Sequence, residues 1–273
     1  MNTKLSPIIK AEDLASLDHS VVIIDASAGS KDRYNQSHLK GALFVDVNTD
    51  LADIGDFARG GRHPLPTLAH FSHLLQKLGI EKNSHVVVYD DKNGANAAAR
   101  FWWMLRAIGH EQVQVIDGGY DAAIKAGFPT SAAIEAVNTV APYQVTSWAL
   151  PLTGMNEVES AVKASDYIVV DVRDANRFAG LTEPIDLIAG HIPGAVNIPF
   201  TENLKSDGTF QDPQVLREKY TSALGSVSPE NVIVHCGSGI TACHTLLAMD
   251  YAGLTIPSLY VGSWSEWSRN KVD

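Results

Sequence analysis

The sequence predicts an α/β protein made of two copies of one unit, each a small parallel sheet with helices on both faces. Two observations lead to this prediction. Short apolar segments recur in the same order in both halves of the 273-residue chain. These segments also alternate with longer stretches of helical periodicity, such as residues 101–109 and 245–253, each of which ends on glycine. Continuous apolar strands between helices are typical of a parallel sheet that is buried on both faces.

The recurring segments keep a nearly constant spacing. The segments ending at Asp25 and Asp90 repeat at an offset of 146 residues, and a His-x-x-Gly-Ala turn repeats at 153. Four matches in the same order indicate a duplicated fold. The matching pairs are 21–25 with 168–171, 38–42 with 191–195, 86–90 with 232–236, and 115–120 with 259–264.

The repeat also predicts the domain boundaries. A first domain is expected over residues 1–130 and a second over 154–273. The stretch 131–153 between them is rich in small residues and contains Pro142 and Pro151, so it is interpreted as a linker. The histidines of the repeated turn, His38 and His191, are expected to be structural polar residues of that turn.

Composition limits the possible partners. The net charge of −10 argues against a nucleic-acid or anionic-membrane surface, and the N-terminus lacks the long apolar stretch of a signal peptide or membrane helix. The two cysteines lie seven residues apart, which is no disulfide framework, and Cys243 is expected in the core. A reducing compartment, the cytoplasm, is therefore the predicted location. No cofactor is expected, and the cysteine segment lacks the ligand spacing of a metal site.

The segment from Val232 to Cys243 carries the clearest chemical signal. A β-branched run ends on Cys236, and a loop with Gly237 and Gly239 leads into a predicted helix. Ligands of parallel sheets bind at the carboxyl ends of strands, and backbone N–H groups and a helix N-terminus stabilise a thiolate there. Cys236 is therefore a candidate nucleophile. The first copy has Asp90 at the equivalent position, so one active site per chain is expected.

The whole arrangement resembles the two-domain sulfurtransferases of the rhodanese superfamily. The resemblance is carried by the duplicated unit, by Gly190-His191-Ile192-Pro193-Gly194-Ala195, by the loop Cys236-Gly237-Ser238-Gly239-Ile240-Thr241-Ala242, and by Gly262-Ser263-Trp264-Ser265-Glu266-Trp267. It implies that the loop cysteine accepts a sulfur atom as a persulfide and passes it to a thiophilic acceptor. It also implies ping-pong kinetics.

The loop sequence bears on the sulfur donor. In this family, enzymes for thiosulfate carry two basic residues after the cysteine, whereas enzymes for 3-mercaptopyruvate carry Gly-Ser-Gly, as found at 237–239. The resemblance therefore implies 3-mercaptopyruvate as donor, with thiosulfate as the alternative. Cyanide, thioredoxin, glutathione or another thiol is the implied acceptor.

The resemblance also implies roles for individual residues. Cys236 is the nucleophile, and Ser238 with His63, in Gly60-Gly61-Arg62-His63-Pro64, forms a proton relay. Arg177 grips the donor carboxylate, which suits its planar fork. The backbone from Gly237 through Gly239 and Ile240 to Thr241 holds the persulfide.

Two departures from the family pattern qualify these roles. The acid of the relay is replaced by Asn48, so Asp46 or another carboxylate is left to support His63. A second arginine expected after Glu183-Pro184 is replaced by Ile185-Asp186, so the donor carboxylate is predicted to meet one arginine only.

Two other readings compete. A cysteine-loop-arginine phosphatase needs an arginine six residues after the cysteine, where this chain has Ala242. A non-catalytic rhodanese-type interaction module is the other alternative, and the intact loop at Cys236 argues against it.

Overall fold

A computed structural model describes residues 5–18, 20–27, 31–137 and 140–271 of the chain. The chain divides into two compact units. The first comprises Met1–Ala52, Pro66–Ala149 and Asp207–Thr209, and the second comprises Asp53–Leu65, Leu150–Ser206 and Phe210–Asp273. The second unit therefore includes a segment from the first half of the sequence, residues 53–65. The bounds predicted for the two domains and their linker stay a prediction, and residues 138–139 of that linker lie outside the described part of the chain.

The first unit is built around a parallel sheet with the strand order β1-β6-β5-β2-β4. A short antiparallel pair, β3 with β7, accompanies it. The strands are β1 (Ile8–Ile9), β2 (Val22–Asp25), β3 (His38–Leu39), β4 (Leu43–Phe44), β5 (Val86–Tyr89), β6 (Val113–Ile116) and β7 (Thr130–Ser131). The helices are η1 (Ala11–Ser16), α1 (Lys31–Gln36), α2 (Leu68–Lys77), α3 (Ala97–Ala107) and α4 (Gly119–Lys125).

The second unit repeats this plan with a parallel sheet in the order β11-β10-β8-β9. Its strands are β8 (Ile168–Asp171), β9 (Val196–Asn197), β10 (Val232–His235) and β11 (Ser258–Leu259). Its helices are α5 (Met155–Ala161), α6 (Ala175–Phe178), η2 (Phe200–Asn203), α7 (Pro213–Leu224), η3 (Pro229–Asn231), α8 (Thr241–Tyr251) and α9 (Ser263–Lys271).

The strand register confirms the internal repeat. Asp25 of β2 pairs with Tyr89 of β5, and Asp171 of β8 pairs with His235 of β10. Both partners of the second pair are offset from the first by the 146 residues that the sequence showed. The two strands that matched in sequence therefore occupy the same neighbouring positions in both sheets.

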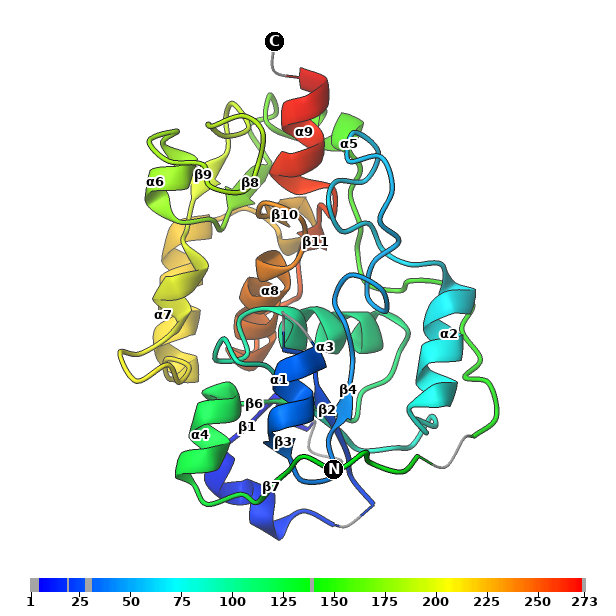
Figure 1. The fold of residues 1–273 in the computed structure, drawn as a ribbon. Coiled ribbons are helices and arrows are strands. Elements are labelled where there is room, and N and C mark those ends of the chain that lie inside the picture. Colours follow the sequence, from blue (N-terminus) through cyan, green and yellow to red (C-terminus); the bar gives the residue numbers. More distant parts are fainter. Residues whose placement is uncertain (1–4, 19, 28–30, 138–139, 272–273) are drawn as a thin grey trace. The chain divides into compact units, whose positions relative to one another are not determined.

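Successive side chains of the second sheet pack against two different layers of helices. Val169 and Ile233 belong to a buried cluster with residues of α5 and α9, such as Val158 and Trp264. Successive side chains of a strand point to opposite faces, so Val170 and its neighbours face the other layer. Figure 1 shows α7 and α8 on that second face, with α8 (orange) following β10. Both faces of the sheet are thus covered by helices, and a binding site is expected at the carboxyl ends of the strands.

The repeated histidines have equivalent surroundings. His38 Nδ1 lies 2.7 Å from the Tyr34 carbonyl oxygen and its ring stacks on Tyr34 at 3.9 Å, whereas His191 Nδ1 lies 2.8 Å from the Phe178 carbonyl oxygen and stacks on Phe178 at 3.9 Å. His38 belongs to β3 rather than to a turn, because its backbone pairs with β7. The structural interpretation of both residues agrees with these contacts.

No helix in the described part of the chain is long and apolar enough to cross a membrane.

Candidate active site

Cys236 lies directly after β10 and is only 2 % exposed. Its backbone N–H donates to Ser263 Oγ at 3.2 Å, and its carbonyl accepts from the N–H of Trp264 at 3.1 Å. Gly239 has φ +74°, and a Cβ there would lie 2.7 Å from the carbonyl oxygen of Val261, so only glycine fits. The first turn of α9 therefore fixes the loop that carries Cys236 into α8. This position, at the N-terminus of an 11-residue helix, stabilises negative charge on sulfur.

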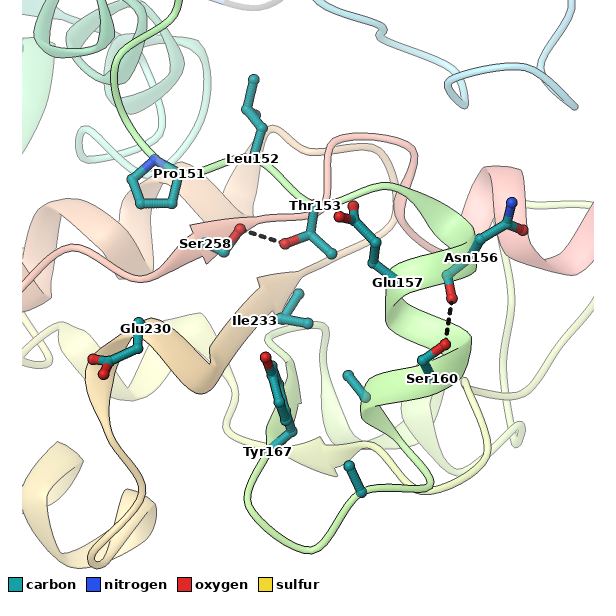
Figure 2. Close-up of a pocket in the computed structure, with 12 residues that line it drawn as sticks. Pro151, Leu152, Thr153, Asn156, Glu157, Ser160, Tyr167, Glu230, Ile233 and Ser258 are labelled. Carbon is teal, nitrogen blue, oxygen red and sulfur yellow. Dashed lines mark hydrogen bonds between the residues drawn. The ribbon is translucent and has the colours of Figure 1, made fainter.

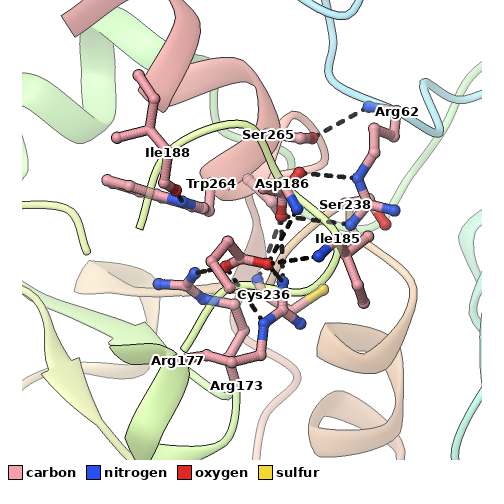
Figure 3. Close-up of polar contacts among 12 residues, drawn as sticks. Arg62, Arg173, Arg177, Ile185, Asp186, Ile188, Cys236, Ser238, Trp264 and Ser265 are labelled. Carbon is pink, nitrogen blue, oxygen red and sulfur yellow. Dashed lines mark hydrogen bonds and ion pairs between the residues drawn. The ribbon is translucent and has the colours of Figure 1, made fainter. Parts of the chain in front are cut away.

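The segment 53–65 supplies Arg62 and His63 to the same unit. The N–H of Arg62 donates to Ser265 Oγ at 3.0 Å (Figure 3). The N–H of Gly60 donates to Glu266 Oε1 at 2.7 Å. Gly61 has φ +77°, and a Cβ there would lie 2.3 Å from the carbonyl oxygen of Gly262, the residue before α9. Glycine at position 61 is therefore needed for the close approach of this segment to the entry of α9.

Ser238 and His63 form the hydrogen-bonded pair that the sequence predicted. His63 Nδ1 lies 2.8 Å from Ser238 Oγ, and the Ser238 side chain is buried. Asp46, which was left to support His63, accepts hydrogen bonds through Oδ1 from the backbone N–H groups of Asn48 and Thr49. The role of Asp46 or Asn48 behind His63 stays a prediction. The serine–histidine pair, by contrast, has the geometry needed to pass a proton.

Two arginines meet above Gly237, the residue that follows Cys236. A Cβ on Gly237 would lie 2.9 Å from Arg62 Nη2 and 3.4 Å from Arg177 Nη2. Asp186 lies between them, because its Oδ1 accepts from Arg62 Nε at 2.9 Å and its Oδ2 from Arg177 Nη2 at 3.2 Å (Figure 3). The structure thus places a second arginine beside Arg177, and it comes from the segment 53–65 rather than from the residues after Glu183. How many arginines the donor carboxylate meets stays a prediction.

These two arginines belong to a row of alternating charges. Arg173 binds Asp171 through Nη2 at 2.6 Å and Glu183 through Nη1 at 3.3 Å, and Glu183 binds Arg177 at 2.7 Å. Burial by itself raises the pKa of Glu183, but the hydrogen bonds from Arg177 and from two backbone N–H groups outweigh burial and lower it overall. Glu183 is thus held as a carboxylate that orients Arg177. Neither Arg173 nor Glu183 was predicted to belong to the site. An arginine two residues after Asp171, at the end of a predicted strand, was the signal for the first of them.

The first unit shows how the equivalent loop holds a carboxyl group. Asp90 takes the place of Cys236 and is fully buried. Each of its carboxylate oxygens accepts two backbone hydrogen bonds, at 2.8–3.1 Å, from Lys92, Gly94, Asn96 and Ala98. Burial raises the pKa of Asp90 overall, although these N–H groups act in the opposite direction. Four N–H donors directed at two oxygens form a site that suits a negatively charged acceptor.

The remaining predicted residues line the same loop. Ile240 precedes α8 and Thr241 begins it. Neither Cys236 nor Cys243 forms a disulfide. Cys243 is fully buried with its Sγ 3.3 Å from the Gly239 carbonyl oxygen, so it belongs to the core as expected.

A separate cavity of about 640 Å³ lies beside α5 (Figure 2). Its lining includes Tyr167, which precedes β8, and Glu230, which precedes β10. Thr153 and Ser258 are hydrogen-bonded to each other on its wall. None of the predicted site residues lines it, and it lies toward the amino ends of the strands. Among the described residues, no group of three or more His, Cys, Asp or Glu side chains is arranged to hold a metal ion.

Comparison with known proteins supports the sequence resemblance. Residues 10–126 and 155–270 each match the family model described as a rhodanese-like domain. A Pseudomonas aeruginosa protein named "Probable 3-mercaptopyruvate sulfurtransferase" is 38% identical over 267 residues, which cover 97% of this chain and 92% of that protein. The thiosulfate sulfurtransferase of Mus musculus is 33% identical over 271 residues, covering 95% and 89%.

A solved structure agrees with the fold. The structure of 3-mercaptopyruvate sulfurtransferase from Leishmania major matches with a TM-score of 0.79 and 29% identity, covering 97% of this chain and 75% of that one. The similar proteins thus include enzymes named for both donors that the sequence analysis weighed.

Proposed function

Because this chain belongs to the family of rhodanese-like domain proteins, we propose that it moves a sulfur atom from 3-mercaptopyruvate to a thiol or cyanide through a persulfide on Cys236. Membership confirms the predicted fold of two tandem rhodanese-like domains and the predicted class of enzyme, a sulfurtransferase. The observation that carries the proposal is the convergence of two arginines and the Ser238–His63 pair on the loop of Cys236.

The donor half-reaction follows from these positions. Arg177 and Arg62 bind the carboxylate of the donor, and the Cys236 thiolate attacks the donor's sulfur. The new S–S bond forms as the C–S bond breaks, and the electron pair of the C–S bond leaves on carbon as the enolate of pyruvate. The Ser238–His63 pair takes the proton of the donor's thiol and delivers it to the carbon of that enolate, so that pyruvate leaves and a persulfide anion remains on Cys236. Backbone N–H groups of the loop stabilise the sulfur anion left on the enzyme.

The acceptor half-reaction returns the enzyme to its starting state. A thiolate, such as that of glutathione or thioredoxin, or cyanide attacks the outer sulfur, and the S–S bond breaks with its electron pair on Cys236. Because the nucleophile must cycle through a thiolate, a reducing compartment such as the cytoplasm suits this chemistry.

Thiosulfate is the second candidate donor. Two arginines rather than one lie over Gly237, which favours binding of a more highly charged anion. The loop itself, however, has no basic residue from Gly237 to Thr241, and carboxylates accompany both arginines. These features favour 3-mercaptopyruvate.

Trapping the persulfide tests the proposal directly. Incubation with 3-mercaptopyruvate and no acceptor is expected to add one sulfur atom to the intact mass, located on the peptide that contains Cys236. Addition of cyanide should remove that sulfur as an equal amount of thiocyanate. Cys243→Ala is the matched control and should gain the sulfur like the wild type. A sulfur atom on Cys243, or no gain of mass from either donor, would contradict the proposal.

The Ser238–His63 pair makes a second prediction possible. His63→Ala is expected to lower kcat with 3-mercaptopyruvate by about 10²-fold, because the enolate then loses its proton donor. Turnover of thiosulfate should change little, since its leaving group, sulfite, has no enolate carbon that must be protonated. Steady-state kinetics with both donors measure this ratio, with His73→Ala, an exposed residue of α2, as control. An equal loss with both donors would mean that His63 only positions the loop.

A further inference from the structure

Asp186 occupies the place where a donor carboxylate has to bind. Its side chain is fully buried, and its two oxygens bridge Arg62 and Arg177 directly above Gly237. A carboxylate between two guanidinium groups is the arrangement that Arg62 and Arg177 would offer to a bound donor. The protein thus supplies from its own chain the group that the donor would bring.

The charges around the two arginines are balanced without a donor. Asp186 and Glu183 are both buried carboxylates, and each forms an ion pair with Arg177. Arg173, the third arginine of the row, is matched by Asp171. Three arginines therefore face three carboxylates, and an arriving anion meets a neutral cluster rather than two free positive charges.

The side chain of Asp186 can change without dismantling its turn. The backbone N–H groups of Ile185 and Asp186 both donate to Glu183 Oε1, at 3.1 and 2.9 Å, and these bonds do not involve the Asp186 carboxylate. Glu183 is itself held by Arg173 and Arg177. The turn is therefore anchored by Glu183, which leaves the Asp186 carboxylate free to act on selectivity.

From this placement we infer that Asp186 is a specificity-determining residue, an internal carboxylate that competes with anionic donors for Arg62 and Arg177 and disfavours dianions most. The effect of Asp186 on turnover rests on the proposed function, whereas its effect on anion binding does not. Repulsion between charges scales with their product, so a dianion such as thiosulfate loses about twice the free energy that a monoanion loses. Asp186 thereby adds to the preference for 3-mercaptopyruvate that the uncharged loop provides.

Binding of non-reacting anions to Asp186→Asn tests this inference. Titration calorimetry with sulfate as a dianion and pyruvate as a monoanionic keto acid is expected to show a Kd lowered about tenfold for sulfate and about threefold for pyruvate. The KM for thiosulfate should fall in parallel with the Kd for sulfate, with little change in kcat. Asp186→Ser removes the charge without adding an amide and should behave in the same way.

The controls separate this inference from the proposed function. Asp166→Asn makes the same change of charge at an exposed residue before β8, at the opposite edge of the sheet, and should leave both Kd values unchanged. The calorimetric result holds whether or not sulfur is transferred, so a protein that fails to form the persulfide still tests Asp186. Weaker anion binding in both Asp186 variants would mean that the carboxylate orients the arginines, and unchanged binding would mean that anions bind elsewhere; either result overturns the inference.

Discussion

Cys236→Ser is expected to lower kcat/KM for 3-mercaptopyruvate by a factor of roughly 10³ or more, because the proposed reaction has no covalent path without the thiolate. Sulfur is a far stronger nucleophile than oxygen, and a serine hydroxyl is scarcely ionised at neutral pH. The substitution is nearly isosteric. The backbone bonds of residue 236 to α9 therefore remain, and the loss should appear in turnover rather than in folding.

The measurement compares both donors under the same conditions with wild type, Cys236→Ser and Cys243→Ala. Cys243 is a core residue, so its variant should keep most of the activity once its folded fraction is accounted for. A wild type that prefers 3-mercaptopyruvate, and a Cys236 variant that loses both activities, are the expected results. Substantial turnover in Cys236→Ser would remove the nucleophile from the mechanism and favour a non-covalent site elsewhere.

The sequence was most informative where the chemistry is local. Cys236, its glycine loop and the following helix are contiguous, so their placement follows from strand and helix patterns alone. The repeat predicted two equivalent units, and in their sheets Asp171 lies beside His235 as Asp25 lies beside Tyr89. Family resemblance added the Ser238–His63 contact, which joins residues 175 positions apart and which no periodicity could have indicated.

The arginine arrangement lay beyond the sequence for a physical reason. Arg62 and Asp186 are 124 residues apart, and they meet because the segment 53–65 packs with the second unit. The sequence showed one departure here, Ile185-Asp186 where the resemblance implies an arginine. The structure shows where that aspartate lies, between Arg177 and an arginine from another part of the chain.

The loop of the first unit provides the second large effect. Asp90→Ala is expected to destabilise that unit by about 3 kcal/mol or more, because an unpaired buried donor costs about 1–3 kcal/mol and four backbone N–H groups lose their acceptor. Hydrogen exchange of the peptide that spans β5 and the start of α3, residues 86–100, reports this unit separately from the other. Exchange of this peptide should accelerate far more than exchange of the peptide around β10.

Two further variants make this result specific. Asp121→Ala removes an exposed aspartate of α4 in the same unit and should stay within about 0.5 kcal/mol of wild type. Asp90→Asn keeps one oxygen acceptor but turns an amide N–H₂ toward two of the four donors, so its loss should approach that of the alanine variant. If Asp90→Ala were as stable as wild type, the loop would keep its shape without an acceptor at this position. In that case Asp90 would no longer support the proposal that the equivalent loop at Cys236 is built to hold a negatively charged sulfur, whereas a large loss would show that the four N–H groups of the loop need an acceptor.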